Sequence, residues 1–381
     1  MTFEDEVINI RRHIHKNPEP SFKEFKTAQF IEKKLKEFKI PSKRVAKTGV
    51  VAEIKSANSK KTVALRADTD ALLICENNKL EYKSKNQGVM HACGHDCHTA
   101  IVLGAAKLLS GEKENLKGNV RFIFQPAEEL SNGAKEMIKE GVLKDSIPEF
   151  ILGVHTSPWI KSGKIAFKYG EMMAAVDKIN ITLCGKIAHG AYPHLGKDAL
   201  IAAANFLNAA QTIVSRELDP TESAVVTFGK ISGGQTYNTI CDEIKLEGTV
   251  RTLNNNTREL IKKSILDKLK ATESAFDVKC VCEYLNFGEP LINTNFVTDI
   301  CRQYAEEFYG KQNVILLEKP SMGGEDFSDY LNIIAGNFMY IGSSKNKDTS
   351  YPWHHCNFNV DESVIPKASR YLAYFCKKFL N

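Results

Sequence analysis

Apolar and polar residues alternate along the first part of the chain in a way that predicts strands separated by helices. Short runs rich in β-branched and aromatic residues predict strands at 50–54, 62–68, 119–125 and 150–155. Between these runs, apolar residues recur at helical spacing over 98–110 and 133–141. Strands that alternate with helices are typical of an α/β domain, in which a mostly parallel sheet carries helices on both faces.

The two ends of the chain are expected to belong to this same domain. Ser21 followed by Glu24 forms a capping-box pattern, which marks the start of a helix, and apolar residues then recur at roughly helical spacing. Near the C-terminus, a helix over 294–309 and a strand and helix within 337–380 would complete the sheet.

A change of pattern midway along the chain predicts a second, inserted domain. Alternating strands and two long helices, over 196–217 and 257–276, follow the order strand, helix, strand, strand, helix, strand. This is the split βαβ, ferredoxin-like order of a small α+β domain. The sequence therefore predicts one domain over 1–174 and 287–381, interrupted by a second over 175–286.

Composition places few further limits on function. The chain has 381 residues, 43% of them hydrophobic and 25% charged, with a net charge of +5, which suits a globular protein of two domains. Basic residues are mixed with acidic ones, so we expect no nucleic-acid partner. No apolar run approaches a membrane span and no apolar leader opens the chain, so we expect a cytoplasmic protein that binds no membrane. The ten cysteines form no CxxC pair and are expected to be reduced.

Acidic residues and a histidine follow the ends of three predicted strands. Asp68 ends one strand and Asp70 comes just after it, Glu128 and Glu129 follow the next, and His155 ends a third. In open α/β sheets, ligands bind outside the carboxyl ends of the strands. These side chains are therefore expected to meet at one edge of the sheet.

The densest group of potential metal ligands is MHACGHDCHTA, at residues 90–100. Thiolate, imidazole and carboxylate groups are typical ligands of Zn, Mn, Co or Ni. Cys93 and His95 would point apart on a helix, but they can converge on a loop, which Gly94 favours. We expect such a loop just before the helix at 98, although buried histidines at a helix start would give the same pattern. His13 and His15, in the first helix, are given a structural or surface role.

The segment FQPAEE, at residues 124–129, adds a carboxylate pair. Pro126 cannot donate to a strand ladder, so the strand is expected to end there. Glu128 and Glu129 would then lie in extended backbone and point in opposite directions. That arrangement suits metal-assisted hydrolysis, in which one carboxylate binds metal and the other acts as general base.

The chain resembles the bacterial and plant branch of the dinuclear metallopeptidase/aminoacylase family, which includes hippurate hydrolase, N-acetyldiaminopimelate deacetylase and the auxin-conjugate hydrolases. The resemblance extends over about residues 8–375. The segments that carry it are IRRHIHKNPEPSFKEFKT, LRADTDAL, MHACGHDCH, FQPAEE, the histidine of GVH, HGAYPH, SAVVTFGKISGG, EGTVRTL, MGGEDF and HHCNFNVDE. Of these, MHACGHD together with QPAEE is the most specific.

The resemblance implies a role for each matching residue. It implies five ligands for two divalent ions (Mn, Zn, Co or Ni), with Cys93 bridging them: Cys93, His95, Glu129, His155 and His354. Glu128 is implied as the general base. Asp68 is implied as an active-site acid that supports and orients the metal site, and Asp70 is the other acid of the same motif.

The inserted domain is similar to the lid and dimerisation domain of this family. His189 resembles a histidine that crosses the dimer interface to the partner's oxyanion, and Asn238 and Arg251 resemble contacts to the substrate carboxylate. The resemblance thus implies a homodimer or homotetramer.

Some positions depart from the family pattern without removing a metal ligand. Leu73 and Cys356 stand where proline is common, and LSNGA follows QPAEE in place of a glycine-rich stretch. The double histidine leaves the register open, with His354 preferred as the ligand and His355 as the alternative.

The implied function is metal-dependent removal of an N-acyl group from a small-molecule N-acyl amino acid. The motifs resemble most closely those of the N-acetyldiaminopimelate deacetylases of lysine biosynthesis. Hippurate hydrolase and a general N-acyl-amino-acid deacylase are the alternatives within the family. Outside this reaction, the alternatives are a dipeptidase or carboxypeptidase and a non-catalytic metal-binding protein on the same fold.

Overall fold

The structure is a computed structural model that describes residues 1–56, 61–144 and 147–381. It contains two compact units: unit 1 comprises Met1–Gly170, Ile292–Lys319 and Asp326–Asn381, and unit 2 comprises Glu171–Leu291 and Pro320–Glu325. The short segment Pro320–Glu325 was expected in the first domain. It belongs to unit 2 because Ser321 N–H donates to the Met172 carbonyl at 2.8 Å and Ala174 N–H donates to the Gly323 carbonyl at 2.9 Å.

Unit 1 is built on one eight-stranded sheet, in the order β1-β2-β4-β3-β5-β16-β6-β15. Its strands are β1 (Ser42–Val45), β2 (Gly49–Ile54), β3 (Thr62–Asp68), β4 (Asn119–Gln125), β5 (Phe150–Lys161), β6 (Ile165–Phe167), β15 (Val314–Leu316) and β16 (Gly336–Ser344). The central strands β4, β3, β5 and β16 pair in parallel, and β1, β2 and β6 add antiparallel pairings. The predicted mostly parallel α/β sheet is thus present at the centre of the unit.

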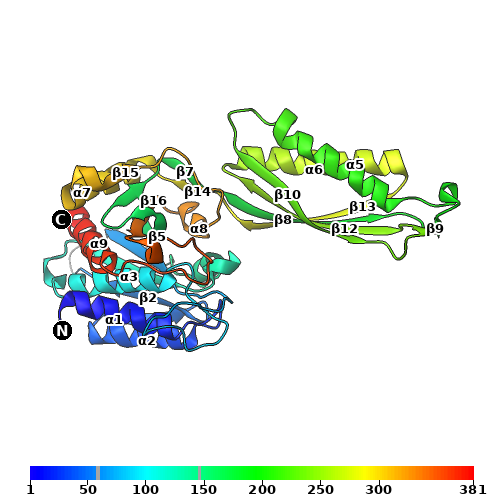
Figure 1. Cartoon of the computed structure of the whole chain (residues 1–381). Helices are drawn as coiled ribbons and strands as arrows, with labels where there is room; N and C mark the ends of the chain where they lie inside the picture. The colour runs from blue at the N-terminus through cyan, green and yellow to red at the C-terminus, as the bar shows by residue number, and fades with distance from the viewer. Residues whose placement is uncertain (57–60, 145–146) are drawn as a thin grey trace. The chain divides into compact units, whose positions relative to one another are not determined.

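Helices cover both faces of this sheet. They are α1 (Phe3–Lys16), α2 (Phe25–Glu37), α3 (His95–Ser110), α4 (Gly133–Lys139), α7 (Asn295–Tyr309), α8 (Ser328–Leu331) and α9 (Val364–Leu380). Val63, Leu65 and Ala67 of β3 pack into an apolar core with α1, α2, α3, α7 and α9, and Figure 1 shows α1, α3 and α9 on this side. Arg66 points to the opposite face, where α4 and α8 lie and where its guanidinium donates to Asp326 at 2.9 Å.

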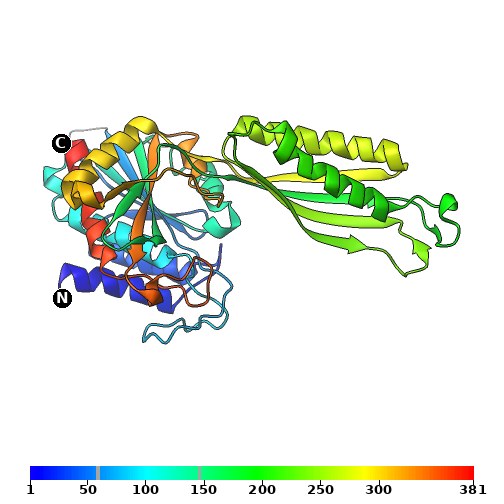
Figure 2. The ribbon, with the colours of Figure 1, turned by 45° about the horizontal axis from the view of Figure 1, so that its top comes forward.

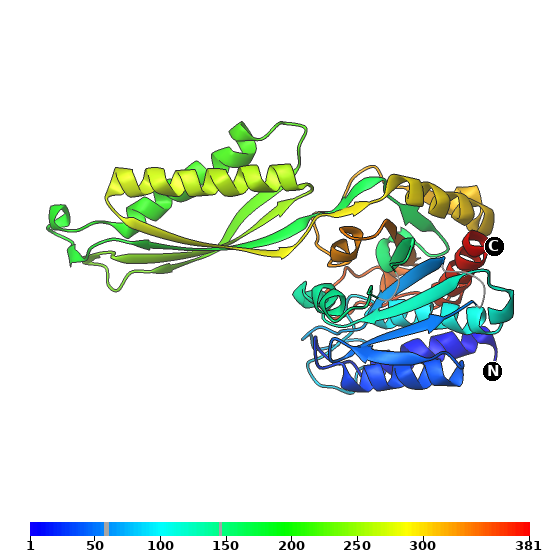
Figure 3. The ribbon, with the colours of Figure 1, turned by 180° about the vertical axis from the view of Figure 1, so that it is seen from behind.

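Unit 2 has the predicted order of elements. Its strands and helices are β8 (Ala175–Cys184), β9 (Ala188–His189), α5 (Ala199–Thr212), β10 (Ala224–Gly233), β11 (Thr239–Ile240), β12 (Glu243–Thr252), α6 (Asn255–Phe276) and β13 (Lys279–Gly288). The antiparallel sheet has the order β10-β12-β8-β13, which is the ferredoxin-like arrangement. Figures 1 and 2 show α5 and α6 on one face of this sheet, and the view from behind in Figure 3 agrees.

Local sequence explains where the two helices of unit 2 begin. Asp198 accepts hydrogen bonds from the backbone N–H groups of Leu200 and Ile201, and Asn254 accepts one from Thr257, as N-cap residues do. The strands β7 (Gly170–Met173) and β14 (Leu291–Asn293) lie where the chain passes between the units. Within the described ranges, no helix has the length and apolar character needed to cross a membrane.

Candidate metal centre

Three neighbouring strands bring polar residues to one edge of the unit 1 sheet. Asp68 ends β3, and β4 ends at Gln125, just before the glutamate pair. The strand β5 does not end at His155, as the sequence predicts, but runs to Lys161 because it continues to pair with β16. Its pairing with β3 stops at Gly153, so His155 still lies close to the end of β3.

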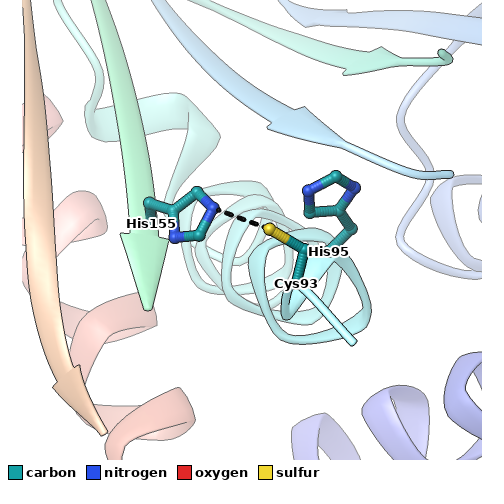
Figure 4. Close-up of side chains that lie close together, drawn as sticks. All are labelled: Cys93, His95 and His155. Carbon is teal, nitrogen blue, oxygen red and sulfur yellow. Dashed lines mark hydrogen bonds between the residues drawn. The ribbon is translucent and has the colours of Figure 1, made fainter. Parts of the chain in front are cut away.

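Cys93 and His155 face each other across this edge, with Cys93 Sγ 3.4 Å from His155 Nε2 (Figure 4). The helix α3 begins at His95, three residues earlier than predicted, and Cys93 lies on the loop before it. Gly94 joins Cys93 to His95 with a left-handed φ of 92°, which glycine adopts readily. A Cβ at this position would lie 2.3 Å from Thr156 Oγ1, so the predicted loop depends on glycine.

The glutamate pair is not extended, which corrects the sequence prediction. Glu128 and Glu129 begin a 3-10 turn, Glu128–Leu130, after Ala127 in the left-handed region at a φ of 53°. The turn replaces the strand because carboxylates elsewhere in the fold accept the backbone N–H groups: Asp70 accepts those of Glu128 and Glu129, both at 3.1 Å. As a result both glutamate side chains approach His95 Nε2, at 3.8 and 3.9 Å.

His354, rather than His355, lies beside these groups. Its Nε2 is 3.4 Å from Glu129 Oε1, and its backbone N–H donates to the Ala92 carbonyl at 2.8 Å, which ties this loop to the Cys93 loop. His355 instead stacks on Tyr351 with ring centroids 4.7 Å apart.

The ligand atoms form overlapping groups, each within 4.8 Å, and two of these groups share Cys93. One group is Cys93, His95 and His155, and another is Cys93, Glu129 and His354. Two ligands of one ion, each bonded at about 2.0–2.3 Å, lie at most about 4.6 Å apart. In addition, His95 Nε2 is buried and makes no hydrogen bond within the described chain. A divalent cation on each side of Cys93 therefore fits these residues.

The charges at the centre also favour cations. Burial lowers the pKa of His95, but the carboxylates of Asp68 and Asp70 outweigh it and raise that pKa to about 10. Burial raises the pKa of the Cys93 thiol, and the nearby Glu129 and Glu128 raise it further. The His95 shift therefore reflects the negative charge of the nearby carboxylates, which bound cations would neutralise.

Comparison with known proteins identifies the family of the chain. The family model described as Peptidase family M20/M25/M40 matches residues 64–378. The chain belongs to this family. It is therefore a hydrolase of the M20 family, as the sequence motifs predict.

Individual relatives of this M20 hydrolase extend over nearly its whole length. An N-acetyl-L-cysteine deacetylase of Bacillus subtilis is 43% identical over 100% of this chain and 89% of its own. An N-acetyldiaminopimelate deacetylase of Listeria monocytogenes is 36% identical over 97% of this chain and 98% of its own. The crystal structure of a Bacillus subtilis dinuclear metal binding peptidase from the M20 family superposes with a TM-score of 0.86, at 34% identity over 99% of this chain and 98% of its own.

Asp70, rather than Asp68, contacts the proposed ligand His95 in this M20 hydrolase. His95 Nδ1 lies 2.9 Å from the Asp70 carbonyl and 3.2 Å from its carboxylate, whereas Asp68 is 3.9 Å away. Asp68 instead bonds His98 Nδ1 at 2.7 Å and accepts from Arg66 at 2.7 Å. The family resemblance implies the orienting role for Asp68, whereas in the structure Asp70 makes the contact to His95.

Two residues that the sequence did not single out support His155. The Thr156 carbonyl is 2.9 Å from His155 Nδ1 and also accepts from Trp353 Nε1 at 2.9 Å. A proton on Nδ1 leaves Nε2, which faces Cys93, available to bind a cation. The Trp353 ring also packs on the His155 ring, with centroids 4.7 Å apart.

Asp96 and His15 lie next to the centre but do not belong to it. Asp96 accepts from Arg11 at 2.7 Å, and its carboxylate lies 2.8 Å from His15 Nδ1. These buried contacts join α1 to the start of α3 and give His15 the structural role expected of it. His13 stacks on Phe30 with centroids 4.0 Å apart.

The three residues singled out in unit 2 do not lie together within one chain. His189 pairs with Thr239, and Gly190 N–H donates to the Asn238 carbonyl at 2.7 Å, so His189 and Asn238 are neighbours. This pair lies beyond the Cys184 end of β8, where Glu243 of β12 pairs, while Arg251 pairs with Val176 at the other end. The eight residue-to-residue steps from Glu243 to Arg251 span about 27 Å at roughly 3.4 Å per step.

Proposed function

We propose that this M20 hydrolase removes the N-acyl group from an amino acid with the help of two divalent cations. The observation that carries the proposal is the pair of ligand groups that share Cys93, with Glu128 beside them. Cys93, His95, Glu129, His155 and His354 would hold the cations. Relatives over the whole chain that are named as deacetylases support the same reaction.

The chain's own residues account for the proton transfers of amide hydrolysis. When bound, the cations supply Lewis acidity to the amide carbonyl and make a water molecule more acidic. Glu128 takes a proton from that water as the water oxygen bonds to the carbonyl carbon. As the C–N bond breaks, Glu128 returns the proton to the leaving amine nitrogen. Asp70 keeps His95 and the glutamate turn in place through its four hydrogen-bonding partners.

We propose that His189 and Asn238 act on the active site of a partner subunit. Within one chain they lie about 27 Å along the sheet from Arg251, so one substrate cannot contact all three residues of the same chain. His189 is exposed, and its Nδ1 accepts a local bond from Ala191 N–H at 3.1 Å. This leaves Nε2 available to a second subunit, and we propose that it binds the oxyanion at the partner's site in a homodimer.

Subunit exchange tests this arrangement. Glu128→Gln and His189→Ala homodimers should each be inactive or nearly so. After mixing, a heterodimer has one site with both Glu128 and His189, so random exchange should restore about a quarter of wild-type activity. Native mass spectrometry would confirm that exchange has occurred. Exchange without recovered activity would show that His189 does not act across an interface.

For the substrate we propose an N-acetyl amino acid. The sequence motifs favour N-acetyldiaminopimelate, but the N-acetyl-L-cysteine deacetylase is more similar, with 43% identity against 36%. We therefore place N-acetylcysteine first and N-acetyldiaminopimelate second.

One structural observation favours an aromatic acyl group as the alternative. Trp159 is 64% exposed, and its ring centroid lies 4.3 Å from that of Trp353, which packs on His155. An exposed aromatic surface beside the centre would suit the benzoyl group of hippurate.

A substrate screen distinguishes these reactions. Metal-free protein is loaded with Mn, Zn, Co or Ni and given N-acetyl, N-benzoyl and N-succinyl amino acids and a panel of dipeptides. We expect N-acetyl substrates to have a kcat/KM at least about tenfold above N-benzoyl ones, a ratio within the reach of pocket contacts. Cleavage of dipeptides alone would replace the proposal with a peptidase.

A further inference from the structure

The segment 17–27, NPEPSFKEFKT, resembles its family but has no role in the proposed reaction. The sequence predicts that Ser21 and Glu24 form a capping box for α2. The structure contradicts this, because Glu24 precedes α2 without a side-chain cap. The N-terminal part of α2 is instead held by Glu19, whose carboxylate accepts from Thr27 N–H at 2.9 Å and from its hydroxyl at 3.0 Å. The side chains of Ser21 and Glu24 therefore bond other parts of the fold.

Glu24 bonds the loop that carries the glutamate pair, and Ser21 bonds Asp70, which accepts hydrogen bonds from that loop. The Ser21 hydroxyl donates to Asp70 at 2.7 Å. Glu24 is fully buried, and its Oε1 accepts the backbone N–H of Ala127 at 2.9 Å, while Thr48 donates to its Oε2 at 2.7 Å. Two buried carboxylates, Glu24 and Asp70, therefore accept three consecutive backbone N–H groups, those of residues 127, 128 and 129.

The fold explains why this loop needs such support. β4 ends at Gln125, Pro126 has no N–H, and Ala127 takes the left-handed conformation, which is costly for a residue with a side chain. Its N–H then points into the interior, where a donor without a partner is strongly unfavourable. Three successive N–H groups around anionic oxygens resemble the nests in which backbone amides bind anions, here with the anions supplied by the protein.

We propose that Glu24 is a positioning residue for the catalytic pair, in that its carboxylate holds the Ala127 amide and so fixes the turn carrying Glu128 and Glu129. This inference rests on the proposed function, in which Glu129 binds a cation and Glu128 moves the proton. The carboxylate of Glu24 bonds Thr48 and Ala127 and none of the five proposed metal ligands. It acts on the geometry of the two glutamates through the Ala127 peptide, whose carbonyl also accepts from Gly133 N–H at 3.2 Å.

The surroundings of Glu24 disfavour its charged form. Burial and the neighbouring charge of Asp70 raise the pKa of Glu24 to about 7, against the hydrogen bonds from Thr48 and Ala127. Burying this carboxylate is unfavourable on its own. It satisfies two buried donors, Thr48 Oγ1 and the Ala127 N–H, which would otherwise lack an acceptor.

The test compares Glu24→Ala and Glu24→Gln with a matched control, Glu19→Ala. Glu19 lies in the same segment and makes the same kind of carboxylate–amide bond, but its carboxylate accepts from Thr27 of α2 and not from residues 127–129. The first measurement is hydrogen–deuterium exchange of the metal-free protein in the peptide covering residues 126–132. In Glu24→Ala we expect this peptide to exchange at least about tenfold faster, because the Ala127 amide has lost its acceptor, whereas Glu19→Ala should leave it unchanged.

The second measurement separates positioning from general destabilisation. Titration with Co²⁺ should show affinity weakened about tenfold or more in Glu24→Ala, and kcat should fall by a similar factor with KM nearly unchanged, as for residues that orient metal ligands. Glu24→Gln keeps the volume and one acceptor oxygen, so it should recover most of both. If Glu24→Ala does not fold, Glu24→Gln carries the test through a rise in exchange of about threefold, since a neutral acceptor binds less strongly than a charged one.

The outcomes separate the two proposals. Exchange in residues 126–132 that is as slow in both Glu24 variants as in Glu19→Ala would overturn the role of Glu24. Fast exchange in Glu24→Ala would support the role of Glu24 in holding the Ala127 amide. If the wild-type protein then hydrolysed no N-acyl amino acid with any metal, the proposed function would be wrong while this role would stand.

Discussion

Glu128→Gln is expected to keep the full complement of bound metal and to lose about 10²–10⁴-fold in kcat, the range that general acid–base catalysis contributes. Glutamine has the size of glutamate and keeps the backbone N–H that donates to Asp70, so the turn and the ligand Glu129 should stay in place. It cannot accept a proton from water or return one to the amine. Metal content by elemental analysis and kcat on N-acetyl substrates check the two halves of this expectation.

A matched substitution separates catalysis from a change of charge. Glu136 lies eight residues further along, in α4, and its carboxylate pairs with Lys139 near the surface. Glu136→Gln removes the same charge and should leave kcat within about twofold, as most surface substitutions do. Near-normal turnover by Glu128→Gln would mean that another group is the base.

Cys93→Ala is expected to abolish metal binding at both positions. Cys93 belongs to two groups of potential ligands, Cys93–His95–His155 and Cys93–Glu129–His354, so its loss would remove a ligand from each of the two proposed cations. Glu129 and the three histidines that remain would offer each cation only two ligands, fewer than a stable site needs. After dialysis against metal-free buffer we expect almost no bound Zn or Mn and no detectable turnover.

Cys97→Ala provides the control for this substitution. Cys97 is also buried in this region but lies beside Asp96 and Arg11 rather than in the cluster. Its replacement should keep metal and activity, with only a small loss of stability from the missing sulfur. A Cys93→Ala protein that still binds two equivalents would exclude a bridging thiolate.

The sequence predicts the large features of the molecule because they depend on local patterns. The ferredoxin-like order of unit 2 follows from periodicity alone, and β2, β3 and β4 lie within a residue of their expected limits. The convergence of Asp68, the glutamate pair and His155 follows from a general property of parallel sheets. Each of these features follows either from neighbouring residues in the chain or from a rule that holds for parallel sheets in general.

The details of the centre depend on contacts between distant residues, which no local pattern contains. Ser21 and Glu24 have the spacing of a capping box, yet they bond Asp70 and the Ala127 amide. The carboxylates of Glu24 and Asp70 accept the backbone N–H groups that follow Pro126. These residues therefore form a turn instead of the extended backbone that the sequence predicts. Likewise, only the three-dimensional structure shows that Asp70, and not Asp68, reaches His95.

The left-handed glycine before α3 limits how this centre can be redesigned. A library that randomises the loop to change metal preference can vary the donors on either side of position 94, but not that position itself. Any side chain there would collide with Thr156, whose Oγ1 lies 2.3 Å from where a Cβ would stand, and would also have to adopt a φ of 92°. A change of metal preference must therefore come from replacing the side chains that bind the metal, while the backbone at Gly94 keeps its conformation.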